Sequence, residues 1–271
     1  MSTDAQQAGR DGHEPQNWQK WHEQRVGSVS APYGPLSLTG THWLGDHPDG
    51  RLPAVPGSWV PDGDEVVLTA GPEDVLTVDG KPFTGSIRLT TDHAPIPESR
   101  VAHGRRRLVV LRREGLWAVR DFDPDSPARR TFEGIEATAY DPRWAVPGTF
   151  RAYPESRSVR VENADGRERG LGLGGEITFP LDGVEHTLRV AVEQDGSLWA
   201  VFADATSGNG SYRFRFLRPP APAADGTVTV DFNRSLLPPC AFADHFICPF
   251  PPPGNTLAVE IAAGERNLRD R

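Results

Sequence analysis

Short apolar runs separated by turn residues repeat along this sequence from Leu36 onward. The intervening stretches are rich in Gly, Pro and Asp, and the chain contains 28 Gly and 26 Pro. Asp-Gly pairs begin at positions 79, 182, 195 and 225, between such runs, where a hairpin turn requires positive φ. The pattern predicts a mostly β fold, built as an antiparallel sandwich or a barrel-like sheet. The predicted strands lie at residues 36–38, 65–68, 86–89, 107–111, 116–119, 150–153, 158–161, 176–179, 186–192, 197–202, 212–216 and 226–232.

One N-terminal helix is predicted over residues 17–29. Trp18, Trp21 and Val26 recur there at helical spacing among polar residues, and Pro32 ends the pattern. Residues 1–14 are polar and are predicted to form a disordered tail. The rest is divided into two β halves, so that residues 15–148 hold the helix and the first half, and residues 149–271 hold the second.

The overall charge of the chain is acidic. Its 37 Asp and Glu against 29 Lys and Arg give a net charge of -8, whereas non-specific nucleic-acid binding needs a surplus of positive charge. The N-terminus has no basic start followed by an apolar run, so neither a signal peptide nor a membrane anchor is expected. The expected location is the cytoplasm. The expected partners are a small-molecule ligand and, as an option, a second copy in a homodimer, with no nucleic acid and no membrane.

Residues 170–175 form a glycine-rich run that superficially resembles a nucleotide-binding loop. A pyrophosphate site of that kind needs a strand before the glycines and a helix after them, and neither is predicted here. We therefore predict a flexible or bulged loop between strands.

The most informative segment is residues 231–265. Its prolines fix the backbone and remove hydrogen-bond donors, so this segment must be held by packing and by side chains such as Asn233 and Asn255. Rigid loops on a β scaffold are where binding sites are often built. We expect the functional site to include this segment.

Two cysteines and a histidine in this segment leave several interpretations open. Cys240, His245 and Cys248 are suitable zinc or copper ligands, with Asp244 as a weak fourth, and no other cofactor is expected. A Cys240–Cys248 disulfide is a second interpretation. Two buried free cysteines are the third and favoured one, since cytoplasmic cysteines are normally reduced. A nucleophilic cysteine would need a base or a positive field, and His245 is the base nearest in sequence.

A polar loop at residues 206–211 leads into Tyr212, Arg213 and Arg215. The hydroxyl and amide groups of this loop, including the Ser207 hydroxyl, together with Arg213 and Arg215, are suited to binding an anionic ligand such as a carboxylate. The alternative is an ordinary β-turn followed by one outward, solvated Arg.

A second pattern joins separate parts of the chain. It comprises residues 36–44, 125–134 and 206–212, and near the C-terminus residues 231–233, 239–242, 248–249, 251–252, 255, 257 and 263–265. Through these residues the sequence resembles the bacterial and archaeal family of domains of unknown function numbered 1684, over residues 17–266. The resemblance implies a fold and the location of a site, but no reaction. Residues 237–239 depart from the family's usual Asn-Pro, and Gly254 stands where its members carry an acid.

The leading hypothesis is a small-molecule-binding protein with a pocket between the 207–212 loop and the C-terminal segment. Its specific form is a cofactor-independent acid–base enzyme acting on a small polar or carboxylated metabolite. One alternative is a structural or protein-interaction module that docks through Phe242, Phe246 and Phe250, and another is the metal protein described above. The candidate catalytic residues are Asp231, Asn233, His245 and Tyr212, and the candidate ligand contacts are Ser207, Arg215 and Asn255.

Overall fold

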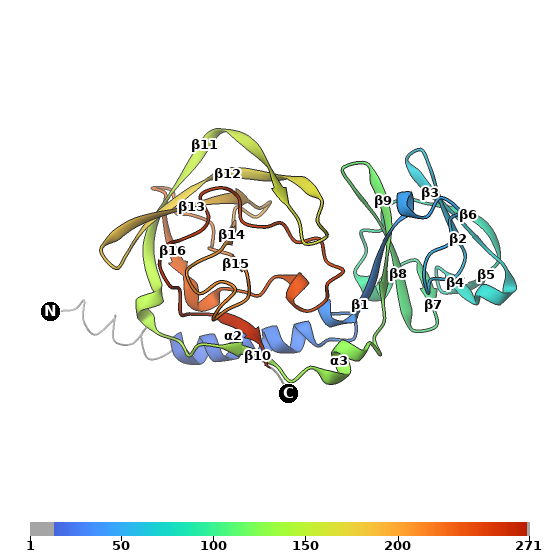
Figure 1. The fold of residues 1–271 in the computed structure, drawn as a ribbon, viewed down its shortest axis with the longest axis horizontal. Coiled ribbons are helices and arrows are strands. Elements are labelled where there is room, and N and C mark those ends of the chain that lie inside the picture. Colours follow the sequence, from blue (N-terminus) through green and yellow to red (C-terminus); the bar gives the residue numbers. More distant parts are fainter. Residues whose placement is uncertain (1–13, 270–271) are drawn as a thin grey trace. The chain divides into compact units, whose positions relative to one another are not determined.

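The computed structural model describes residues 14–269, which form two compact units (Figure 1). One unit is Ser28–Phe132, and the other combines residues 14–27 with residues 133–269. This division differs from the predicted boundary at residue 148, because the N-terminal helix contacts Asn233 and Glu265 and belongs with the C-terminal unit. The predicted tail lies outside the described residues, except for Glu14, where the helix begins.

The unit Ser28–Phe132 contains two antiparallel sheets. Their strand orders are β1-β9-β8-β7-β4-β5 and β2-β3-β6. Trp59, Leu68 and Val119 lie in its core and are completely buried, since alternate residues of each strand face inward. The elements are β1 (Leu38–Trp43), β2 (Ser58–Asp62), β3 (Glu65–Ala70), β4 (Leu76–Val78), β5 (Lys81–Phe83), β6 (Gly85–Leu89), β7 (Val101–His103), β8 (Arg106–Arg113), β9 (Leu116–Phe122) and a short helix, α3 (Pro127–Thr131).

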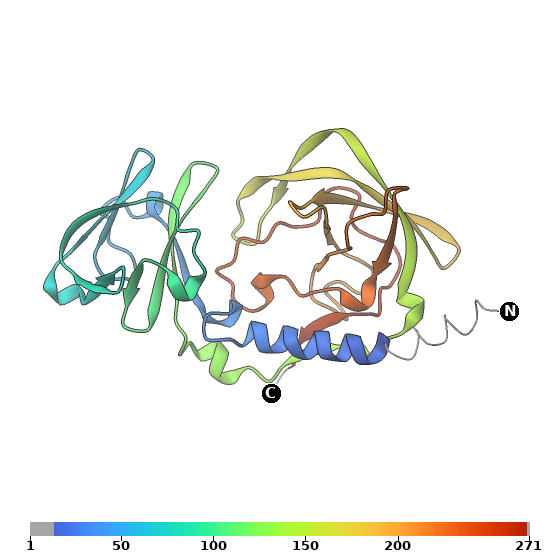
Figure 2. The same ribbon diagram turned by 180° about the vertical axis from the view of Figure 1, so that it is seen from behind.

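The second unit is built on a strongly curved antiparallel sheet. Its strand order is β15-β14-β13-β12-β11-β16, and β10 pairs with β17 in a separate two-stranded sheet. The long strands β11 and β12 arch over the core, and the helix α2 runs beneath it, on the side where β17 lies (Figures 1 and 2). The elements are α2 (Glu14–Val29), β10 (Ile135–Ala137), β11 (Ala145–Glu162), β12 (Glu168–Leu181), β13 (Val184–Val192), β14 (Leu198–Phe202), β15 (Arg215–Leu217), β16 (Thr227–Asp231) and β17 (Glu265–Leu268).

The predicted mostly β, antiparallel fold with one N-terminal helix is confirmed. Two strands predicted at 150–153 and 158–161 are parts of the single strand β11, whose register with β12 shifts between Ala152 and Arg157. No helix among residues 14–269 combines the length and apolar character needed to cross a membrane.

The prediction of a loop at the glycine-rich run 170–175 is wrong. These residues lie in the middle of strand β12. A Cβ on Gly175 would lie 2.4 Å from Cε2 of Phe150, and one on Gly174 would lie 2.7 Å from Cγ2 of Val192. Gly174 and Gly175 therefore allow neighbouring side chains to lie directly against the strand, and this close approach, rather than a turn, accounts for these two glycines.

Candidate functional site

The C-terminal segment, residues 232–264, follows β16 and reaches β17 without forming a regular strand. It contains two short 3-10 helices, Phe232–Arg234 and Pro239–Ala241. Such a segment has few ladder hydrogen bonds, so its backbone groups need partners elsewhere. Several of the predicted catalytic and ligand-binding residues are these hydrogen-bond partners.

Asn233 is completely buried and fastens the segment to residue 141. Its Oδ1 accepts from the Asp141 amide at 3.0 Å, and its Nδ2 donates to the Asp141 carbonyl at 3.0 Å. Asp231 accepts from both the amide and the side chain of Asn233, at 3.0 and 2.9 Å, and pairs with Arg234 at 3.3 Å. The two predicted catalytic residues therefore contact each other, but their roles are structural. Asn233 binds the backbone of Asp141, and Asp231 caps the 3-10 helix Phe232–Arg234.

Asn255 is also completely buried and joins the segment to two strands of the sheet. Its Oδ1 accepts from the Arg189 amide at 2.8 Å, and its Nδ2 donates to the carbonyls of Arg189 and Val201, at 2.9 and 2.8 Å. Every polar atom of this side chain is engaged with backbone. Asn255 is therefore a structural clip, and the predicted ligand contact is not supported by this geometry.

Arg215 points into the protein, whereas an anion contact would have to be reachable by ligand. Its side chain is completely buried and pairs with the equally buried Asp204 at 2.6 Å. Its other donors reach the carbonyls of Ile261 at 2.8 Å and Ala263 at 2.5 Å. The hydroxyl of Ser207, another predicted ligand contact, accepts from the Asp204 amide at 3.0 Å. Both residues thus stabilise the loop that precedes Tyr212.

Sequence reasoning missed Glu265, a second buried charge. Its Oε2 accepts from the Leu237 amide at 2.7 Å, and its Oε1 pairs with Arg25 of α2 at 3.2 Å. Burial raises the pKa of Glu265, and the nearby Arg25 acts in the opposite direction. This carboxylate ties the helix to the C-terminal segment.

The metal-site interpretation is not supported by the arrangement of its ligands. Among residues 14–269, Cys240, His245 and Cys248 do not assemble into a group of ligands that could hold a metal ion. His245 is exposed, whereas the two cysteines are buried and free, as the favoured interpretation predicted. They also form no disulfide in this structure.

The group with most chemical potential surrounds the sulfur of Cys240. We call Cys240, Cys248, Tyr212 and Arg213 the thiol cluster. The Cys240 amide donates to the Cys248 sulfur at 3.3 Å, and the Tyr212 hydroxyl lies 3.6 Å from the Cys240 sulfur and 3.2 Å from its carbonyl oxygen. The exposed Arg213 interacts with the Cys240 side chain, and its guanidinium carbon lies 4.6 Å from the Phe250 ring centroid.

Within the thiol cluster, the pKa values of Cys240 and Tyr212 are shifted in opposite directions. A hydrogen bond with Cys248, assisted by Tyr212 and Arg213, lowers the pKa of Cys240 to about 7, although burial acts against this change. Burial raises the pKa of Tyr212, and its contact with Cys240 adds to that increase. Tyr212 therefore stays protonated and serves as a hydrogen-bond donor to Cys240, not as a base.

Arg213 is predicted beside Arg215 as a group that could bind an anion, and the predicted strand 212–216 would place both on the same face, but only Arg215 is among the candidate ligand contacts. In the structure β15 begins only at Arg215, so alternation does not extend back to residue 213. The Phe residues on either side of Arg215 are buried as well. A strand that is buried on both faces offers no alternating pattern from which to read the direction of an Arg.

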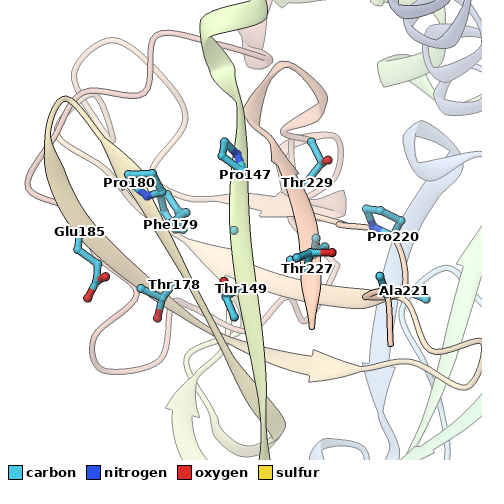
Figure 3. Close-up of a pocket in the computed structure, with 13 residues that line it drawn as sticks. Pro147, Thr149, Thr178, Phe179, Pro180, Glu185, Pro220, Ala221, Thr227 and Thr229 are labelled. Carbon is cyan, nitrogen blue, oxygen red and sulfur yellow. The ribbon is translucent and has the colours of Figure 1, made fainter. Parts of the chain in front are cut away.

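A large cavity lies elsewhere, on the outer face of the sheet formed by β11, β12 and β16 (Figure 3). It has a volume of about 780 Å³, and of the described residues lining it Glu185 alone carries a titratable side chain. Two further cavities of about 350 and 290 Å³ are lined by other parts of the two units. None of the predicted site residues lines any of these three cavities, so the expected shared pocket is not found there.

The docking alternative required exposed aromatic side chains in the C-terminal segment. Phe242 is buried and lies beneath Arg25, whose guanidinium carbon is 5.4 Å from its ring centroid. Phe246 and Phe250 are half-buried and pack against the cluster that contains both cysteines. These aromatics are largely committed to the protein's own core.

A known protein family matches the part of the chain that contains the C-terminal segment. Residues 130–266 match the family described as "Protein of unknown function (DUF1684)". The match includes the expected resemblance at residues 206–212, but it starts at residue 130 and so does not include the resemblance expected at residues 36–44. No curated protein matches the chain.

The chain is also similar to an uncharacterized protein of Haloarcula marismortui whose solution NMR structure is known. The two are 33% identical, the match covers 53% of this chain and 82% of the other, and the TM-score is 0.44. The family match covers half of this chain and includes the whole segment that carries the thiol cluster. The chain therefore belongs to the DUF1684 family.

Proposed function

We propose that this chain is a small-molecule-binding protein in which the sulfur of Cys240 reacts with a small anionic electrophile held by Arg213. The carrying observation is the surroundings of Cys240: the Tyr212 hydroxyl lies 3.6 Å from its sulfur, the Cys248 sulfur lies 3.3 Å from its amide nitrogen, and Arg213 interacts with its side chain. The acidic and amide side chains first expected to be catalytic hold backbone groups instead. The proposal thus keeps the expected ligand class but assigns the chemistry to a different residue.

The electrostatics of the thiol cluster support a nucleophilic role. A thiolate, not a thiol, is the attacking species, and a pKa near neutrality makes much of Cys240 available in that form. Arg213 supplies positive charge and is exposed, so it can contact an anionic ligand from solvent. Tyr212 donates to the sulfur and orients it.

Access to the sulfur requires movement of its cover. Cys240 is only 3% exposed, and the half-buried Tyr212, Phe246 and Phe250 pack against its cluster. A ligand therefore reaches the sulfur when one of these side chains changes rotamer. We expect slow, selective modification rather than the fast reaction of an exposed cysteine.

Alkylation of the full chain by two matched reagents tests this proposal. The rate at Cys240, followed by peptide mass spectrometry from about pH 5 to about pH 9, should rise with a midpoint near 7, as thiolate forms. An ordinary cysteine has its midpoint at about 8.5. Negatively charged iodoacetate should be favoured over neutral iodoacetamide, relative to their ratio for a free thiol.

Two variants test which side chain causes the preference of Cys240 for iodoacetate. Arg213→Gln should reduce the preference for iodoacetate by about threefold or more, because the local positive charge is lost. Arg218→Gln is the matched control: Arg218 is also exposed but pairs with Glu193, 3.7 Å away, and its loss should leave the preference unchanged. A midpoint of about 8.5 or above, with no effect of Arg213→Gln, would show that Cys240 is an ordinary buried thiol.

A further inference from the structure

Cys248 is placed to complete a two-thiol reaction begun by Cys240. The chain contains two cysteines, so an internal disulfide within it can join only these two. The Cys248 sulfur accepts a hydrogen bond from the Cys240 amide at 3.3 Å, and the two side chains also interact directly. Attack of one sulfur on the other therefore needs no large rearrangement of the backbone.

The backbone on both sides of this pair is fixed. Asn163 donates from Nδ2 to the Ile247 carbonyl at 2.9 Å, and the Ala164 amide donates to the Cys248 carbonyl at 2.8 Å. Pro239 and Pro249 border the two cysteines and restrict φ on either side. The structure thus holds the two sulfur atoms near each other before any substrate binds.

The two thiols are not equivalent. The Tyr212 hydroxyl and the Arg213 guanidinium both interact with Cys240, and these groups stabilise its thiolate. Cys248 interacts with the Cys240 side chain, and its own sulfur accepts from the Cys240 amide. This asymmetry distinguishes an attacking thiol, Cys240, from a resolving thiol, Cys248.

We propose that the ligand of the thiol cluster is a small disulfide carrying carboxylates, and that the cluster reduces it by thiol–disulfide exchange. This inference rests on the proposed function, in which Cys240 is the nucleophile and Arg213 the anion contact. It deepens that function by naming a substrate class and a role for Cys248.

The exchange is balanced in two steps. The Cys240 thiolate attacks one sulfur of the substrate, the substrate S–S bond breaks, and the first thiolate leaves while a mixed disulfide remains on Cys240. Cys248 then gives its proton to solvent and attacks the Cys240 sulfur, and the second substrate thiolate leaves. Two electrons pass from the protein thiols to the substrate, and the two protons lost by the protein reappear on the two product thiols.

Oxidised glutathione is a suitable probe, since it is a small disulfide with several carboxylates. The reduced full chain, incubated with a molar excess, should acquire a Cys240–Cys248 disulfide that peptide mapping identifies, with release of two thiols per chain. Cys248→Ser should stop after the first step and accumulate one glutathionyl group on Cys240, at least tenfold above the wild-type level. Cys240→Ser should accumulate no adduct at Cys248 above one-tenth of that level.

The wild-type peptide map needs no variant, so the test stands even if a substitution prevents folding. An unbridged wild-type chain, or a stable glutathionyl adduct on wild-type Cys240, would overturn the inference. Normal iodoacetate reactivity with no reaction towards oxidised glutathione would reject this substrate class and leave the proposed function intact. Loss of both reactions would reject the proposed function as well.

Discussion

Arg215 and Asp204 form an ion pair whose side chains are completely buried. Removing two charges from water is costly, and the cost is offset only where hydrogen bonds satisfy both groups. Asp204 also accepts from the amide of Thr206 at 2.8 Å and from that of Ile261 at 3.2 Å. This pair therefore connects three stretches of chain, and its function is structural.

Asp204→Asn should destabilise the protein by about 3 to 5 kcal/mol, because it leaves the Arg215 charge buried without a counter-ion. Glu193→Gln is the matched control in the same unit: Glu193 pairs with Arg218 through side chains that are 40% and 52% exposed. We expect the control to cost at most about 1 kcal/mol. Urea unfolding measures both, and equal effects would contradict this account.

The same carboxylate predicts a pH dependence of stability. Burial alone would raise the pKa of Asp204, but Arg215 and the hydrogen bonds from Thr206 lower it overall. A lowered pKa in the folded state stabilises the protein above the unfolded value of about 3.9, and this contribution is lost as the pH falls through the folded value. The unfolding midpoint of the wild type should therefore fall more steeply than that of Asp204→Asn below about pH 4.

At the level of elements, helix α2 stabilises the C-terminal segment through a few polar contacts. The Trp18 indole donates to the Asn233 carbonyl at 2.7 Å, and Arg25 donates to the Leu237 carbonyl at 3.0 Å besides pairing with Glu265. These contacts hold the C-terminal segment at Asn233 and at Leu237, near its beginning. The predicted helix is thus part of the framework that holds the C-terminal segment.

Arg25→Met should destabilise the protein by about 3 kcal/mol near pH 8, because Glu265 would remain buried and charged without its partner. Since burial already raises the pKa of Glu265, and Arg25 lowers it, the variant should raise that pKa further. The contribution of a carboxyl with a raised pKa is present at low pH and lost as the pH rises. The difference between variant and wild type should therefore shrink as the pH falls from about 8 to about 5.

Lys20→Met provides the control for the helix, because Lys20 is exposed on the same element. It removes a positive charge of similar size without exposing a buried carboxylate, so its effect on the unfolding midpoint should be small and independent of pH. A pH-independent loss of stability in Arg25→Met would show that lost packing, not the Glu265 charge, is responsible.

At the level of the whole molecule, the unit Ser28–Phe132 has a core of its own. Trp59, Val66, Leu68 and Val119 are completely buried within it, and its strands pair only with each other among the described residues. The family match at residues 130–266 lies almost entirely outside this unit. The region shared with the family and the unit Ser28–Phe132 are therefore distinct structural parts of the chain.

A fragment comprising Ser28–Phe132 should fold without the rest of the chain, because its core is complete. We expect dispersed amide resonances and a single cooperative thermal transition. The same fragment with Leu68→Asp should lose both, since a charge would replace a completely buried side chain. An unfolded spectrum for the unmodified fragment would show that its core depends on the remainder of the protein.

The sequence by itself determined the mostly β fold, the antiparallel hairpins and the N-terminal helix, because turn chemistry and periodicity depend on neighbouring residues. Only the tertiary structure decided which polar side chains were free for chemistry. Arg215, Asn255 and Asn233 bind backbone groups 46, 66 and 92 positions away. Burial and long-range partners, which no local pattern encodes, turned these residues into structural supports and brought Arg213 and Tyr212 to Cys240.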